Sequence, residues 1–230
     1  MDLSIIIPTY NEAARIGRLI HYLRTHAKGA RVFVANSPCT TDDTARVAEA
    51  AGAEVFNCPT AGRAQQMNYA AAHTRGELIY FVHADTVPPK TFVKDIEEAM
   101  RSGVRLGYFR YRFDSDRLML RINSYCTRFD GLFAGGGDQT LFICRNTFLQ
   151  LGGFREELRL MEDFDLVKRA RAADIPHRLI QRDAVVSARK YQHNSWLRVN
   201  LVNLWVFLLF HCGMPTDRLC GMYRKLLRTE

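Results

Sequence analysis

The first hundred residues alternate two hydrophobic patterns, and this alternation leaves few folds open to the chain. Residues 3–8, 31–35, 54–57 and 77–82 are short apolar runs typical of strands. The first and last of these runs are continuous enough for strands buried on both faces. Strands separated by helices form βαβ units, whose right-handed crossovers give a parallel sheet with helices on both faces. The sequence therefore predicts an α/β fold.

Helix signals lie between these runs. Asn11 is a suitable N-cap for a helix that extends to about residue 26, with apolar residues at helical spacing. Thr41 and Asp42 cap a second helix through residue 51, and Gly62 opens a third that ends near residue 73. Each predicted crossover between strands thus contains a helix.

The second half of the chain is less regular. Residues 107–113 alternate in polarity, which predicts a half-exposed strand. The other elements that we expect are a strand at 140–144 and helices at 118–129, at 161–173 and from 194 onwards, the last broken at 213–215.

Ligands of open α/β sheets bind beyond the carboxyl ends of the strands, so the polar residues at these ends are candidates for a site. Asp85 follows the strand at 77–82 and suits a divalent cation, which needs few carboxylates when a diphosphate supplies further oxygens. Alternatively, Asp85 only caps a helix that begins near Pro89. Arg63 follows Gly62 at a helix start, where free N–H groups and a guanidinium suit an anion.

Two segments of the second half add further polar groups. Gly137, Asp138 and Gln139 place flexible backbone beside a carboxylate and an amide, as in a loop that holds a substrate. Glu162 and Asp163 are paired carboxylates at a helix start, where burial and the like charge can tune one of them as a general base. Alternatively, the pair only compensates the helix dipole.

Taken in order, these motifs resemble the family 2 glycosyltransferases of the GT-A fold. Each motif alone is weakly specific, but seven occur in the right order over nearly the whole chain. His-Ala-Asp at 83–85, with segments 187–190 and 223–224, is most similar to a small subgroup, the radical-SAM/selenodomain-associated transferases. The seven matching segments are 5–12, 40–44, 62–68, 83–86, 137–139, 151–154 and 161–163.

The resemblance implies a nucleotide-diphosphate sugar donor and a role for each matching residue. Asp163 and Glu162 would be the catalytic carboxylates, with Asp163 the base that deprotonates an acceptor hydroxyl in a single inverting displacement. Asp85 would hold the Mg²⁺ or Mn²⁺ that neutralises the leaving diphosphate. Gly137, Asp138 and Gln139, beside Glu162, would line the acceptor and sugar site. The donor would contact Pro8, Thr9, Tyr10, Glu12, Ser37, Gly62, Arg63, Gln66, Ala84, Arg189 and Lys190, with Arg63, Arg189 and Lys190 on the phosphates.

The length of 230 residues favours one domain with an appendage. We expect a GT-A catalytic domain over 1–193, divided into a nucleotide-binding half (1–105) and an acceptor-binding half (106–193). A helical C-terminal appendage would follow over 194–230.

Two departures from the family pattern bear on the ligands. Family members usually carry Asp-Gly-Gly-Ser after the second strand, where the Asp reads the nucleotide base, but this chain has Asn36-Ser37-Pro38-Cys39. Asn or Ser hydrogen-bonds a base edge more weakly and with other preferences, so a uridine donor is not implied. His83 replaces the first acid of the usual Asp-x-Asp. It is either a metal ligand beside Asp85 or an ordinary histidine at a strand end.

The formal net charge of +8 indicates an anionic partner, and most of the excess lies in the tail. Residues 187–230 contain seven basic and two acidic side chains. Within them, residues 204–210 are apolar all round a helix and have basic flanks. Such a helix contacts an anionic membrane surface, a second subunit of a homodimer or the protein core.

The ends and the cysteines bear on the compartment. The chain opens without a signal-peptide pattern, its six cysteines form no Cys-x-x-Cys pair, and no apolar stretch reaches the roughly 18 residues of a membrane span. We expect a cytoplasmic protein, either in solution or peripheral on the inner face of the membrane. The acceptor would be either lipid-linked or a small molecule.

Two other functions stay open. One is a nucleotidyltransferase that makes a sugar nucleotide, although no Gly-rich Lys/Arg phosphate loop follows the first strand. The other is a non-catalytic module that binds nucleotides or glycans, although both Asp85 and Asp163 are present. Nucleic acid is not an expected partner, because the basic residues form no recognisable reader motif.

Overall fold

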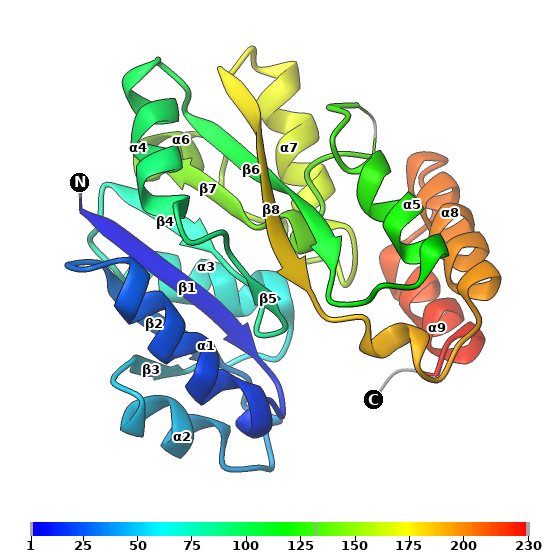
Figure 1. Ribbon diagram of the computed structural model, residues 1–230, viewed down its shortest axis with the longest axis horizontal. Helices are drawn as coiled ribbons and strands as arrows, with labels where there is room; N and C mark the ends of the chain where they lie inside the picture. The colour runs from blue at the N-terminus through cyan, green and yellow to red at the C-terminus, as the bar shows by residue number, and fades with distance from the viewer. Residues whose placement is uncertain (1, 132, 229–230) are drawn as a thin grey trace.

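The computed structural model describes residues 2–131 and 133–228 (Figure 1). The strands of this part of the chain form one sheet of eight. They are β1 (Leu3–Thr9), β2 (Arg31–Asn36), β3 (Glu54–Asn57), β4 (Leu78–Phe81), β5 (Thr86–Val87), β6 (Leu106–Phe113), β7 (Leu141–Cys144) and β8 (His177–Val186). The helices are α1 (Ala13–His26), α2 (Thr44–Ala50), α3 (Arg63–His73), α4 (Phe92–Arg101), α5 (Leu118–Cys126), α6 (Arg145–Gln150), α7 (Glu162–Ala172), α8 (Trp196–His211) and α9 (Thr216–Leu226). Two 3₁₀ turns, η1 (Gly137–Gln139) and η2 (Arg189–Tyr191), complete the described elements.

The sheet has the strand order β3-β2-β1-β4-β7-β6-β8-β5. Strands β3, β2, β1 and β4 are parallel, which confirms the predicted α/β class. The other half is mixed: β7 is antiparallel to both of its neighbours, β6 is parallel to β8, and β5 is antiparallel to β8. The carboxyl ends of β1, β2 and β4 therefore meet at one edge of the sheet.

Helices cover both faces of the sheet (Figure 1). On one face, Leu3, Ile5 and Ile7 of β1 lie in a core with apolar residues of α1, α2 and α4. On the other face, Ile6 of β1 lies in a core with residues of α3, α6 and α7. Both sides of β1 are buried, and this explains the unbroken apolar run at 3–8.

Strand β6 is more buried than its sequence predicts. Tyr108 and Phe109 are both fully buried, because β6 lies between β7 and β8 and has helices on both faces. Only its second half, around Arg112, reaches the surface. The prediction of a half-exposed strand is therefore wrong for the first half of β6.

Other differences are local. Strand β8 was not predicted, because charged and apolar residues do not alternate regularly along it. Its register against β6 shifts between Phe109 and Arg110, and such a bulge disturbs the period of two. The helix at 118–129 ends at Cys126. Asn11 does not cap α1: it has φ +52°, and its Oδ1 accepts a hydrogen bond from the Thr41 amide at 2.9 Å.

The C-terminal helices pack against the end of the sheet. Val199 and Val206 of α8 share a third core with Phe113 of β6 and Val186 of β8. Figure 1 shows α8 and α9 beside α5 at this end of the molecule. One side of α8 is buried in this core, and the other side is exposed. Among the described residues, no helix has both the length and the apolar character that crossing a membrane requires.

Candidate functional site

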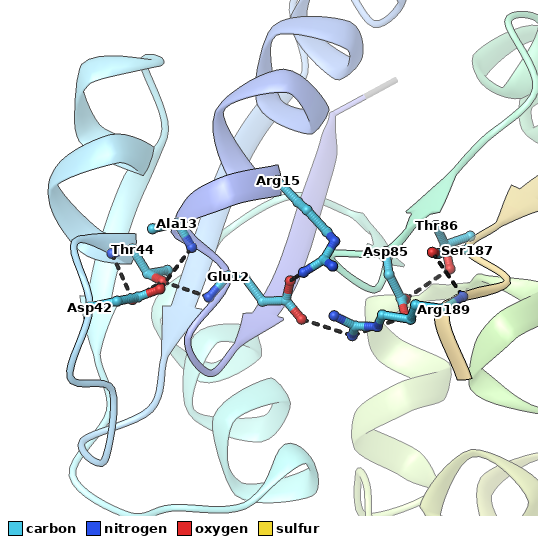
Figure 2. A network of polar contacts seen from close by, with 9 residues as sticks. All are labelled: Glu12, Ala13, Arg15, Asp42, Thr44, Asp85, Thr86, Ser187 and Arg189. Atoms are coloured by element: carbon cyan, nitrogen blue, oxygen red, sulfur yellow. Dashed lines mark hydrogen bonds and ion pairs between the residues drawn. The ribbon is translucent and has the colours of Figure 1, made fainter. Parts of the chain in front are cut away.

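Four charged side chains, those of Glu12, Arg15, Asp85 and Arg189, meet beyond the carboxyl ends of β1 and β4 (Figure 2). Nη2 of Arg189, in η2, lies 2.9 Å from Glu12 Oε1 and 3.1 Å from Asp85 Oδ2. Nη1 of Arg15 lies 3.4 Å from the other oxygen of Glu12. The amide of Ser187 donates to the Asp85 carbonyl at 3.0 Å and so holds η2 against this edge. Arg189 thus joins two residues predicted for different tasks, the nucleotide and the metal.

A second network fixes the backbone at Glu12. The Glu12 amide donates to Thr44 Oγ1 at 2.8 Å, and Thr44 Oγ1 donates to Asp42 Oδ1 at 2.5 Å. The other oxygen of Asp42 accepts from the Ala13 amide at 3.0 Å. These bonds tie the start of α1 to the start of α2 (Figure 2). The segment at 40–44 therefore supports the loop that carries Glu12.

Two of the predicted donor-binding residues, Thr9 and Gln66, form side-chain hydrogen bonds to other groups of the protein. The side-chain nitrogen Nε2 of Gln66 donates to the carbonyls of Thr9 and Ala35, at 2.9 and 2.6 Å. Thr9 Oγ1 donates to Asn36 Oδ1 at 3.1 Å, and Asn36 is 6% exposed. These side chains join β1, β2 and α3, and so they shape the sheet edge at Glu12, Asp85 and Arg189 where the nucleotide is predicted to bind, which we call the donor edge.

The remaining residues of this edge differ in exposure. Tyr10 is 56% exposed just beyond β1, so its ring is open to a flat ligand. Ser37 is buried, and its amide donates to the Thr9 carbonyl at 3.0 Å. Pro8 lies within β1 next to its last residue, and Ala84 lies in the turn that follows β4.

The chemistry of Asp85 fits a divalent cation shared with a diphosphate. Its side chain is 21% exposed, and its Oδ1 lies 3.5 Å from Thr86 Oγ1. Carboxylate oxygen is a hard ligand that Mg²⁺ and Mn²⁺ accept. The described part of the chain gathers no group of three or more His, Cys, Asp or Glu residues that could enclose a metal ion. The protein donors thus suit a cation whose other ligands come from phosphate and water.

A cavity of 630 Å³ lies on the acceptor side of the predicted site. Its polar end is lined by Arg63, His83, Asp138, Gln139 and Asp163. Its other walls come from α5, from the segment that follows α5, and from α8 and α9. The structure therefore brings together predicted residues from the segment after β4 and from α3, η1 and α7, which lie far apart in the sequence.

Gly137 makes this convergence possible. A Cβ atom at this position would overlap His83 Cε1 and lie 2.7 Å from Asp163 Oδ2. Any side chain would therefore displace His83 or Asp163. The His83 ring faces Gly137 in the cavity, while Asp85 contacts Arg189 at the donor edge.

Glu162 and Asp163 differ in their partners. Glu162 is fully buried and pairs with Arg63, whose Nε donates to Glu162 Oε1. Its other oxygen, Oε2, has no hydrogen-bond partner in the described part of the chain. Burial of Asp163, together with the negative charge of Glu162, raises the pKa of Asp163 to about 8. A carboxyl group with such a pKa can take up a proton near neutral pH.

The imidazole of His83 is held neutral by its surroundings. Loss of hydration, followed by the positive charge of Arg63, lowers the pKa of His83 below its ordinary value. A neutral imidazole has one nitrogen lone pair, so it can accept a hydrogen bond from a hydroxyl.

Lys190 and Arg189 are consecutive but lie at different sites. Arg189 is at the donor edge, whereas Lys190 lines the cavity. Lys190 Nζ donates to the hydroxyl of Tyr223 in α9, which in turn donates to Asn203 Oδ1 in α8 at 3.3 Å. The sequence predicted both cations on the diphosphate, and the structure brings only Arg189 beside Asp85.

Sequence reasoning missed the part of the cavity formed by the tail. Asn200, Asn203 and Phe207 of α8 and Tyr223 of α9 all line it. A signal existed in the sequence, because Asn200 and Asn203 lie about one turn apart in a stretch of α8, residues 199–210, that is otherwise apolar.

The chain belongs to glycosyl transferase family 2, whose profile matches residues 4–156. In sequence it is similar to protein RfbJ of Shigella flexneri, with 31% identity over 84 residues, which are 36% of this chain and 64% of RfbJ.

Solved structures share the fold. S. aureus TarS 1–349 in complex with UDP-GlcNAc has a TM-score of 0.67 and 20% identity, over 82% of this chain and 59% of TarS 1–349. The mannosyltransferase PcManGT from Pyrobaculum calidifontis, with GDP-Man and Mn²⁺, has a TM-score of 0.67 and 18% identity, over 89% of this chain and 61% of PcManGT. Glucosyl-3-phosphoglycerate synthase from Mycobacterium tuberculosis, with Mn²⁺, UDP and phosphoglyceric acid, has a TM-score of 0.63 and 19% identity, over 93% of this chain and 79% of the synthase. The chain thus spans less than two thirds of TarS 1–349, of PcManGT and of RfbJ.

Proposed function

We propose that this protein is an inverting glycosyltransferase that moves a sugar from a nucleotide-diphosphate donor to an acceptor hydroxyl with the help of Mg²⁺ or Mn²⁺. One observation carries the proposal. A charged donor edge (Glu12, Asp85 and Arg189) adjoins a cavity that contains a buried carboxylate of raised pKa, Asp163. Transfer between two substrates requires such a pair of neighbouring sites.

At the donor edge, the exposed ring of Tyr10 would stack on the nucleotide base. Arg189 would bind the diphosphate at this edge, and Arg63 would bind it from the cavity, where it pairs with Glu162, because guanidinium groups match phosphate oxygens. Asp85 would hold the divalent cation, which supplies Lewis-acid stabilisation of the leaving diphosphate. Arg189 would then move from Asp85 towards the phosphates.

On the acceptor side, Asp163 would take the proton of the acceptor hydroxyl. The acceptor oxygen forms a bond to the anomeric carbon, and the bond from this carbon to the diphosphate oxygen breaks. The electron pair leaves with the nucleoside diphosphate, and the proton ends on Asp163. Glu162 Oε2 is buried without a partner in the described residues, so it is suited to accept from a hydroxyl of one of the substrates.

The nucleotide base of the donor and the subgroup to which the chain is assigned both stay predictions. TarS was solved with UDP-GlcNAc and PcManGT with GDP-Man, so likeness of fold does not select a base. Asn36, which stands where family members usually carry Asp, has its Oδ1 oxygen bonded to Thr9 and Thr40. Membership of the radical-SAM/selenodomain-associated subgroup rests on the motif at 83–85 and the tail segments, and the cytoplasmic location also stays a prediction.

A thermal-shift screen of UDP-, GDP-, ADP- and CDP-sugars with Mn²⁺ tests the donor site. A ligand at about 100 times its Kd stabilises the folded protein by about 2.7 kcal/mol, which raises the Tm of a chain of this size by about 5–10 °C. We expect one base to give this shift, with a smaller shift in EDTA or in Asp85→Ala. If no sugar nucleotide shifts the Tm, the proposal is wrong.

A further inference from the structure

Helix α8 carries an exposed apolar stripe. Leu197, Leu201, Leu204, Trp205 and Leu208 are each between 44% and 58% exposed. Their spacing places them on one side of the helix, opposite the valines that enter the third core. This stripe accounts for the apolar run at 204–210, because only the other side of the helix is core.

Helix α5 lies beside α8 and adds to the stripe. Asn123 of α5 donates from Nδ2 to Asn200 Oδ1 at 2.9 Å, and its own Oδ1 accepts from Trp196 Nε1 at 3.2 Å. Leu118 and Ile122 of α5 are 68% and 47% exposed. We name the exposed apolar residues of these two helices, namely Leu118, Met119, Ile122 and Tyr125 with the five of α8, the α5–α8 face.

The acceptor cavity opens beside this face. Phe129, Phe133 and Leu204 line the cavity and are each at least 44% exposed, so they mark its mouth. Asp163 lines the same cavity and is 3% exposed, so it marks the closed end. The cavity is therefore polar where transfer would occur and apolar where a ligand enters.

Basic side chains surround the α5–α8 face. Exposed cations on or next to α5, α8 and α9 are Arg117, Arg121, Arg128, Arg198, Arg218, Arg224, Lys225 and Arg228. They outnumber the exposed acids of the same segments, Asp114, Asp116, Asp130 and Asp217, of which Asp130 pairs with Arg171 at 2.5 Å and Asp217 pairs with Arg159 at 3.4 Å. An apolar face with a basic border matches an anionic lipid surface.

The same charges disfavour a second copy of the chain as the occupant. In a twofold dimer the same patch contributes from both subunits, so the two basic borders would face each other. A membrane whose head groups are negative has the opposite charge and also takes up exposed Leu and Trp side chains.

We propose that the α5–α8 face lies on an anionic lipid surface and that the acceptor is a lipid. Its polar head enters the cavity towards Asp163, and its hydrocarbon leaves between Phe129, Phe133 and Leu204 into the membrane. The assignment of the acceptor rests on the proposed function, whereas lipid contact of the face does not.

Flotation of the full chain with vesicles tests the face. We expect binding to phosphatidylcholine vesicles that contain phosphatidylglycerol, and weak binding to phosphatidylcholine alone. Leu201→Gln with Trp205→Gln should reduce the partition coefficient onto the vesicles at least about tenfold, because two apolar side chains then no longer enter the lipid. Leu149→Gln is the matched control: Leu149 is 63% exposed on α6, and its replacement should leave binding unchanged.

A fluorescence experiment locates the contact. The chain has two tryptophans, so Trp196→Phe leaves Trp205 as the reporter. Brominated phosphatidylcholine in the anionic vesicles should quench it. Lack of flotation and of quenching at low salt would overturn the proposal. So would a dimer of the wild-type chain in light scattering that Leu201→Gln with Trp205→Gln converts to monomer.

The acceptor is tested with the labelled sugar nucleotide that passes the donor screen. Incubated with vesicles of lipid extracted from the cells that make the protein, the label should enter the organic phase. Label found only in a water-soluble product would refute the lipid acceptor. If no sugar nucleotide passes the donor screen, the proposed function and the acceptor fail together, while flotation and quenching still decide the face.

Discussion

Asp163 is the residue in which burial and chemistry oppose each other most clearly. Its carboxyl is almost fully buried beside Glu162, so the charged form is disfavoured, yet a base must be charged before it takes a proton. Asp163→Asn should therefore abolish transfer, with a loss of about 10²–10⁴-fold as for other general bases. Donor binding measured by thermal shift should persist. Turnover close to wild type would show that another group is the base.

The same substitution should stabilise the protein. The pKa of Asp163 rises from 3.8 to about 8 on folding, so the folded protein keeps a proton that the unfolded chain has released. Stability is then lost as the pH rises from about 4 to 8. An amide has no such dependence. We expect Asp163→Asn to raise the Tm at pH 8 by about 2–4 °C or more, and to leave it nearly unchanged at pH 4.

The pH dependence of transfer should reveal the same carboxyl group. Because the base acts when deprotonated, kcat/KM should increase as the pH rises towards about 8 and then level off. The negative charge of Asp138 helps to raise the pKa of Asp163. Asp138→Asn should therefore shift the rising part of the pH profile of kcat/KM to lower pH, whether or not the maximum rate changes. A rising part that stays in place would contradict the role of Asp163.

Gly137 tests the packing of the same site. Gly137→Ala should displace His83 or Asp163, because a Cβ atom there overlaps the ring and crowds the carboxylate. We expect the rate of transfer to fall at least about tenfold, while the sugar nucleotide still raises the Tm as it does for the wild-type chain. Gly131→Ala is a matched control, because a Cβ at Gly131 meets no atom within 4 Å and φ is not positive. Equal effects of the two changes would contradict this role of Gly137.

At the scale of elements, η2 carries two consecutive cations, Arg189 and Lys190, that lie at different sites. Arg189→Gln should weaken donor binding, because it removes the cation beside Asp85. Lys190→Met should leave the donor shift in Tm intact and raise the KM of the acceptor, because Lys190 lies in the cavity with Tyr223. Loss of donor binding in both variants would instead support the sequence-based prediction that both bind phosphate.

The elements also show which structural features the sequence predicts. The buried strand at 3–8 and the helix that Gly62 opens occur as expected, because a continuous apolar run and a helix start are local signals. The sequence did not predict strand β8, because its pairing with β6 includes a bulge and its partner lies far away along the chain. Likewise, motif order predicted Asp163 and Gly137, but the contacts of Gln66 and Lys190 depend on the tertiary fold.

At the scale of the whole molecule, the tail is part of the structure that surrounds the site. A chain truncated after residue 193 would lack Val199 and Val206 and would expose Phe113 and Val186. Loss of two buried valines and exposure of their partners costs several kcal/mol. We expect this chain to melt at least about 10 °C below the full chain, as measured by circular dichroism. A truncated chain of unchanged Tm would support an independent domain over 1–193.

The position of the tail has a consequence for how relatives diverge. The family profile ends at residue 156, whereas Asp163 and the cavity walls that α8 and α9 contribute come later in the chain. In the function that we propose, substitutions in α8 and α9 would alter acceptor choice while the donor edge stays the same. Exchange of tails between related proteins would then create new acceptor ranges around an inherited sugar-nucleotide site.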